Sequence, residues 1–154
     1  MKKLIAVLMT LCLLGTACAA LADTESPTWD SMPEAVVEGA DEASFEGEWV
    51  LNVAFSGFEY ADNETLVSKF DYAFVPVKIA GGKITREIQN EYGEFVPEEF
   101  TYTFTAGHLE GTDTEGRSFA VDLLTDGSIC FNVFYPGEDG TVTDLALYMV
   151  HPAE

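Results

Sequence analysis

Aromatic side chains are the residues of this sequence best suited to hold another molecule. In residues 100–105, three aromatic residues alternate with three threonines, a spacing typical of a strand with one buried face. Rings on that face would form an apolar wall, and tyrosine hydroxyls could orient a bound guest. The candidate ligand-binding residues, taken from this and neighbouring segments, are Tyr72, Phe74, Phe100, Tyr102, Phe104 and Phe131.

Catalytic and metal-binding chemistry has few candidates. The sequence contains two histidines, His108 and His151, too few for a zinc site built from several histidines. No Gly-x-Ser-x-Gly motif positions a serine nucleophile. Cys130 follows an isoleucine and precedes a phenylalanine, a setting in which a thiol usually serves as a small apolar filler. We therefore expect no enzymatic activity, no cofactor and no bound metal.

Two acidic turns offer a weak alternative. Residues 113–116 and 138–140 each place two carboxylates beside a glycine. Both lack the longer ligand spacing of an EF-hand loop, and hairpin turns favour the same residues, so we interpret them as turns rather than calcium sites. Arg86 and Arg117 lie far apart in the sequence, and we expect them to be too isolated to form an anion clamp.

The charge of the chain limits its partners. The whole sequence has 7 basic and 27 acidic residues, a net charge of −20. Without residues 1–22, which contain two lysines and no acidic residue, 5 basic residues remain and the net charge is −22. This field repels nucleic acids and anionic lipids, so we expect no nucleic-acid partner. A basic protein partner remains compatible with the charge, although the sequence identifies none.

Residues 1–22 have the three parts of a bacterial-style export signal. Two lysines near the start precede the apolar run 4–14, and small residues stand at positions 20 and 22. The apolar run is too short for a membrane span, which needs ~20 residues. We expect cleavage before Asp23, secretion, and no transmembrane span in the mature chain.

A second cleavage site is the alternative. Residues 14–17 precede Cys18 as a weak lipobox, in which Gly15 stands where a leucine is usual. Cleavage there would leave Cys18 acylated and anchor the protein at the cell surface. In the secreted form, Cys130 is the only cysteine, so no intramolecular disulfide can form.

The mature chain divides into an acidic linker and one domain. Residues 23–44 carry two prolines and no sustained hydrophobic period, which predicts a flexible linker whose Trp29 is a candidate to pack back onto the domain. Residues 45–154 follow a β pattern interrupted by one short helix or wide loop near 60–69. Eight strands are expected, at 49–55, 72–79, 84–92, 100–105, 108–112, 119–123, 129–135 and 142–150.

The order of these strands favours a closed barrel. The strands follow one another through short turns that contain glycine, such as Gly81-Gly82. An open meander would leave two free edges, which closure removes. The sequence therefore predicts an all-β fold, an eight-stranded antiparallel up-and-down barrel, in which the segment near Tyr148 pairs with the segment near Leu51.

The motif Phe45-x-Gly47-x-Trp49 at the start of this meander resembles the opening of the lipocalin-like (calycin) families. The resemblance extends to about residue 150 through strand number and order. It implies that Gly47 allows a close approach near the closed end of the barrel and that Trp49 plugs that end. These families usually stack an arginine on the tryptophan. The last strand here contains no arginine, and His151 is the candidate substitute.

Together these observations predict an exported lipocalin-like protein that binds a small apolar or amphipathic molecule among the aromatic residues. The alternative is a barrel filled by its own side chains, which would act as an extracellular protein-interaction or inhibitor module.

Overall fold

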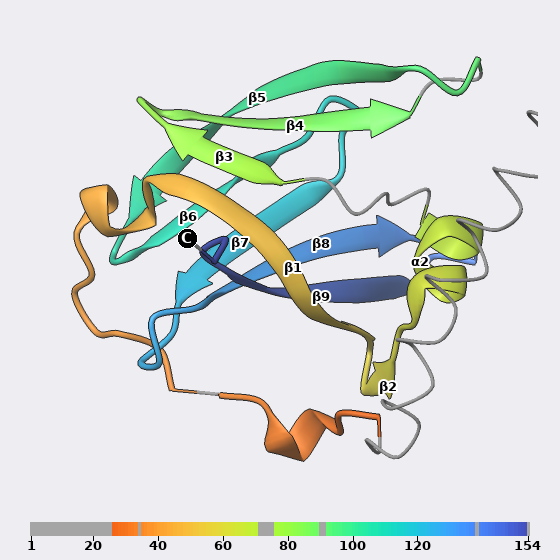
Figure 1. The fold of residues 1–154 in the computed structure, drawn as a ribbon, viewed down its shortest axis with the longest axis horizontal. Coiled ribbons are helices and arrows are strands. Elements are labelled where there is room, and N and C mark those ends of the chain that lie inside the picture. The colour runs from red at the N-terminus through yellow and green to blue at the C-terminus, as the bar shows by residue number, and fades with distance from the viewer. Residues whose placement is uncertain (1–25, 34, 71–75, 90–91, 138, 154) are drawn as a thin grey trace, which may run out of the picture.

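The computed structural model describes residues 26–33, 35–70, 76–89, 92–137 and 139–153. The predicted signal peptide, Cys18, Tyr72 and Phe74 lie outside the described residues. The described chain forms an all-β fold with one α-helix (Figure 1). Its elements are η2 (Trp29–Ser31), η3 (Glu42–Phe45), β1 (Gly47–Ser56), β2 (Glu59–Tyr60), α2 (Asn63–Phe70), β3 (Val77–Ala80), β4 (Lys83–Gln89), β5 (Phe95–Thr105), β6 (His108–Thr112), β7 (Ser118–Leu123), β8 (Ile129–Pro136) and β9 (Val142–Val150).

Strand β1 closes the sheet because it pairs with a different strand along each of its halves. Its first part is antiparallel to β3, with Trp49 opposite Val77. From Val50 onward it is antiparallel to β9, and a register shift between Leu51 and Val53 places Val53 opposite Tyr148. Strands β3 to β8 each pair with the next strand in sequence. Eight strands therefore form a closed antiparallel up-and-down barrel, as predicted, and β2 adds a short pairing to β1.

The tightest hairpin joins β3 to β4 through two glycines. Gly81 and Gly82 have φ values of +58° and +79°, and Ala80 pairs with Lys83 across the turn. A two-residue turn with positive φ at both positions matches the twist of the flanking strands, and glycine adopts it without steric cost. The predicted hairpin is confirmed.

The barrel interior is apolar over most of its length. Along β5 the predicted alternation is confirmed, because Thr101 and Thr103 are exposed whereas Phe100 is buried and Tyr102 is half-buried. Fully buried side chains from the other strands complete the core, among them Ile79, Ile84, Leu109, Val121, Ile129, Leu145, Leu147 and Met149.

Helix α2 covers the end of the barrel where β1, β4 and β8 end (Figure 1). The Asp62 carboxylate caps the helix by accepting a hydrogen bond of 2.8 Å from the Thr65 amide. Leu66 and Phe70 are buried and join the core. The expected short helix is thus present, and it contributes apolar surface to one end of the barrel. No helix of the described residues is long and apolar enough to cross a bilayer.

The described part of the predicted linker runs along the outside of the barrel. The Val37 amide donates to the Leu123 carbonyl, and the Thr125 amide donates to the Ala35 carbonyl, each at 2.9 Å. The Trp29 ring meets the ring of Phe55 edge-on at 5.4 Å. Trp29 and Phe55 belong to a second, smaller apolar cluster on the outer face of β1, β8 and β9, together with the buried side chains of Leu124, Cys130, Ala146 and Tyr148.

Candidate ligand-binding site in the barrel interior

Three phenylalanine rings form a layer across the barrel, and we call Phe100, Phe119 and Phe131 the aromatic layer. The Phe119 ring meets the Phe100 ring edge-on at 5.2 Å and stacks on the Phe131 ring at 5.3 Å. All three side chains are buried. Gly111 makes room for the layer, since a Cβ there would lie 2.7 Å from the Phe119 ring. Phe119 was not among the predicted site residues, although it lies in the strand predicted at 119–123.

The other described candidates on β5 lie nearer the end of the barrel that contains Trp49. Tyr102 packs against the core, and its buried hydroxyl has no hydrogen-bond partner among the described residues. Burial, with a smaller contribution from the Glu42 carboxylate, raises the pKa of Tyr102. Phe104 is 36% exposed and meets the Phe45 ring at 6.4 Å. The structure therefore brings Phe100 and Phe131 together through Phe119 and places Phe104 at the rim.

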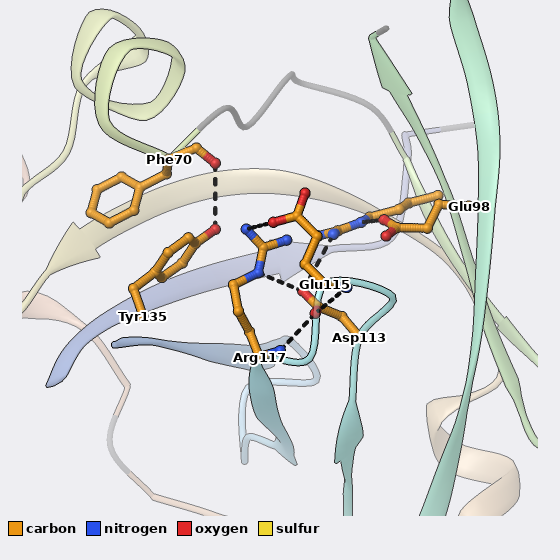
Figure 2. A network of polar contacts seen from close by, with 7 residues as sticks. Phe70, Glu98, Asp113, Glu115, Arg117 and Tyr135 are labelled. Atoms are coloured by element: carbon orange, nitrogen blue, oxygen red, sulfur yellow. Dashed lines mark hydrogen bonds and ion pairs between the residues drawn. The ribbon is translucent and has the colours of Figure 1, made fainter. Parts of the chain in front are cut away.

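A group of four charged side chains lies on the other side of the aromatic layer, and we call Arg86, Glu98, Asp113 and Arg117 the charged cluster (Figure 2). The Arg86 guanidinium pairs with the Glu98 carboxylate. The Asp113 Oδ2 atom lies 2.7 Å from Arg117 Nε and 3.7 Å from Arg86 Nη2. Arg86, Glu98 and Asp113 are each at most 7% exposed.

The expectation that Arg86 and Arg117 are isolated is therefore wrong. The residues lie on or beside β4, β5, β6 and β7, which are consecutive neighbours in the sheet. Arg86 stands directly opposite Glu98 in the β4–β5 register. A strand register would have revealed this pair from the sequence, but the alternation pattern alone does not supply one.

The first acidic turn positions Asp113 toward the arginines. Its Oδ1 atom accepts hydrogen bonds from the amides of Glu115, at 3.0 Å, and Arg117, at 2.9 Å. This leaves Oδ2 directed at the guanidinium groups. Burial of Arg117 tends to lower its pKa, but its interactions with Asp113, Tyr135 and Glu115 together outweigh burial and the pKa is raised. Within the described residues, no three histidine, cysteine or acidic side chains are grouped as metal ligands.

Aromatic rings connect the charged cluster to its surroundings. The Arg86 guanidinium lies over the Phe100 ring at 5.5 Å, and the Arg117 guanidinium lies over the Tyr135 ring at 4.8 Å. The Tyr135 hydroxyl donates to the Phe70 carbonyl at 3.4 Å, as Figure 2 shows. Burial raises the pKa of Tyr135. The cluster thus contacts the aromatic layer on one side and, through Tyr135, the end of α2 on the other.

At the opposite end, the predicted barrel-closing residues lie together. Trp49 is fully buried, and its indole N–H donates to the Phe45 carbonyl at 2.9 Å. The His151 ring stacks on Trp49 with ring centres 3.8 Å apart. A Cβ on Gly47, whose φ is +141°, would lie 3.0 Å from His151, so glycine permits this close stacking. His151 therefore occupies the face of Trp49 for which the sequence offered it as a candidate.

The remaining reactive side chains lie away from the barrel interior. Cys130 belongs to the outer cluster under Trp29, and burial raises the pKa of its thiol to about 11. The thiol is therefore protonated at neutral pH, which makes it a poor nucleophile. The His108 side chain is partly exposed on β6, with Nε2 3.8 Å from the Glu110 carboxylate.

These features define a class of protein by architecture. The chain is a closed, all-antiparallel, eight-stranded barrel with one helix, which is compatible with a calycin-like fold. No protein-family model matches the chain, and no curated protein sequence matches it.

Proposed function

We propose that this protein is an exported, lipocalin-like binding protein whose barrel interior holds a small amphipathic molecule. The observation that carries the proposal is the contact between the charged cluster and the aromatic layer inside the barrel. Buried ion pairs are weak sources of stability, because well-packed apolar side chains of similar volume often serve as well or better. Four charged side chains beside the three rings of the aromatic layer are therefore better explained by recognition than by folding.

The chemistry of the aromatic layer and of the charged cluster indicates which kind of small molecule would bind. The aromatic layer offers rings to the apolar part of a guest. The charged cluster offers guanidinium N–H donors and carboxylate acceptors to its polar part. The Arg86 and Arg117 guanidiniums are already paired with the Glu98, Asp113 and Glu115 carboxylates, so a guest that brings a further charge would bury it without a partner, at a cost. We therefore favour a guest with an uncharged polar head, such as a hydroxyl or an amide.

The proposal also includes export of the protein and a role that is not enzymatic. The signal-like residues 1–22 support secretion, with anchoring through Cys18 as the alternative. The protonated, buried Cys130 thiol supports a role without covalent catalysis. Intact mass of the exported protein tests the first point, since cleavage before Asp23 and acylation of Cys18 give different masses.

A displacement experiment tests the binding proposal. The neutral fluorescent probe N-phenyl-1-naphthylamine should bind the purified protein and be displaced by 1-decanol more effectively than by decanoate or decane. A double variant, R86M/E98M, should lose the preference for decanol over decane. The matched control, K83M/E99M, removes an ion pair of 2.6 Å from the exposed face of the same two strands and should keep that preference. Failure of the probe and of decanol to bind the native protein would refute the proposal.

A further inference from the structure

Exposed apolar side chains gather at one end of the barrel. In the described chain, nine large hydrophobic side chains are exposed. Six of them lie near the ends of elements. One is in the turn after β1, one in β2 and one in α2, and the other three lie just after β4 and at the starts of β5 and β9. Because neighbouring strands are antiparallel, all these positions fall at the α2 end (Figure 1). We call this set the α2-end surface; it comprises Phe58, Tyr60, Val67, Tyr92, Phe95 and Val142.

The most exposed of these side chains gain little from folding. Phe58 is 79% exposed and Val142 is 63% exposed. The Phe58 ring meets Trp29 edge-on at 5.5 Å but leaves most of its area in water. Single exposed apolar residues are ordinary, whereas a group of them at one end of a domain is typical of an interaction surface. Exposed aromatic residues also supply much of the binding energy at such surfaces.

The charge at this end is almost entirely negative. Exposed acidic side chains lie at the same end, among them Glu59, Asp62, Glu64 and Asp139, and Lys69 is the exposed basic side chain of this end in the described chain. Lys78 and Lys83 lie toward the other end, where Lys78 stands opposite Glu48 and Lys83 follows the Gly81-Gly82 turn. Arg86 and Arg117 lie inside the barrel in the charged cluster. The α2-end surface therefore combines exposed apolar side chains with a predominantly negative charge.

We propose that the α2-end surface docks a basic, amphipathic segment of a protein partner. This inference goes beyond the binding of a small molecule and does not depend on it, because the residues involved lie outside the charged cluster and the aromatic layer. Apolar side chains of the segment contact the exposed rings, and its lysines or arginines face the carboxylates around them. The same charge repels anionic membranes and nucleic acids.

Fluorescence anisotropy with a synthetic peptide tests the proposal. The probe is a labelled helical peptide of leucine and lysine, and the comparison peptide replaces every lysine with glutamate. The lysine peptide should bind the whole protein, and its affinity should fall about tenfold or more between low and physiological salt because the attraction is screened. The glutamate peptide should not bind.

Matched variants locate the binding. Val142→Ser combined with Phe58→Ser should weaken binding of the lysine peptide by about tenfold or more. Val36→Ser, the same exchange at an exposed valine away from this end, should leave the affinity within about twofold. Glu59→Lys should weaken binding, whereas Glu38→Lys, on the linker, should do so much less. Equal unfolding midpoints of all variants exclude loss of folding as the cause.

Three results would overturn the proposal. The first is equal binding of the glutamate peptide. The second is a loss of peptide affinity in the control variants as large as the loss in the α2-end variants. The third is binding to neutral phosphatidylcholine vesicles that is lost in the Val142 and Phe58 variant, which would assign the surface to lipid instead. Displacement of the peptide by 1-decanol would also contradict two separate sites, whereas failure of decanol to bind at all would affect only the proposed small-molecule function.

Discussion

Removing Arg86 alone should destabilise the barrel much more than removing Arg86 and Glu98 together. Arg86 is 7% exposed, and its guanidinium faces two carboxylates, those of Glu98 and Asp113. In Arg86→Met, the buried Glu98 carboxylate loses the cation that it pairs with, while Arg117 stays paired with Asp113 and Glu115. Leaving a buried charge without its partner costs about 3–5 kcal/mol, whereas replacing a whole buried pair with apolar side chains is often neutral or stabilising.

Urea unfolding measures the difference. If the free energy of unfolding falls by about 4 kcal/mol and the urea dependence is about 2 kcal/mol per molar, the midpoint of R86M shifts down by about 2 M. The double variant R86M/E98M should return to within about 0.5 M of the native midpoint. The exposed pair on the same strands gives the control, since both Lys83→Met and K83M/E99M should change stability by less than about 1 kcal/mol. Equal destabilisation by R86M and R86M/E98M would refute this reasoning.

Further predictions concern the two ends of the barrel, the outer cluster and the overall charge. His151→Ala should lower the free energy of unfolding by about 1 kcal/mol and alter Trp49 fluorescence, because it removes the stacked ring; unchanged emission would contradict the stacking. Burial raises the pKa of the Cys130 thiol to about 11, against 9.0 for an unperturbed thiol. The stabilisation from this group is therefore present below pH 9.0 and is lost as the pH rises toward 11, and urea unfolding of the native protein and of Cys130→Ala at several pH values measures the loss. Trp29→Ala should speed alkylation of Cys130, since it uncovers the outer cluster; an unchanged rate would show that Trp29 does not protect the thiol. Moderate salt should raise the thermal midpoint by screening repulsion among 27 acidic residues, and a midpoint independent of salt would contradict self-repulsion.

The sequence predicted the barrel well because its signals are local. Alternation in β5 and the Gly81-Gly82 turn depend on neighbouring residues alone, and the need to remove free edges then favoured closure. Closure itself, through pairing of β1 with β9, is confirmed.

The charged cluster could not be predicted in the same way. Arg86 and Arg117 are separated along the chain by two intervening strands, and only the registers of β4 to β7 bring them to the same level of the barrel. A charged residue at an inward position is also contrary to the usual pattern of a buried face. Exceptions of this kind are expected at functional sites, where binding is favoured at the expense of stability, and the proposed function makes the charged cluster such a site.

At the end of the barrel that contains Trp49, the structure shows which residue packs on the tryptophan. The lipocalin-like families that the Phe45-x-Gly47-x-Trp49 motif resembles usually stack an arginine there, and the last strand of this chain contains none. His151, just beyond β9, provides a planar ring there, and Gly47 leaves room for it.

Nuclear Overhauser contacts between a bound alcohol and the aromatic rings test the central claim most directly. With 1-decanol and the native protein, contacts from the alkyl chain to Phe119 and Phe131, and from the hydroxyl end toward Tyr135, are the predicted result. Contacts confined to exposed rings such as Phe58, or no contacts to any ring, would contradict binding inside the barrel.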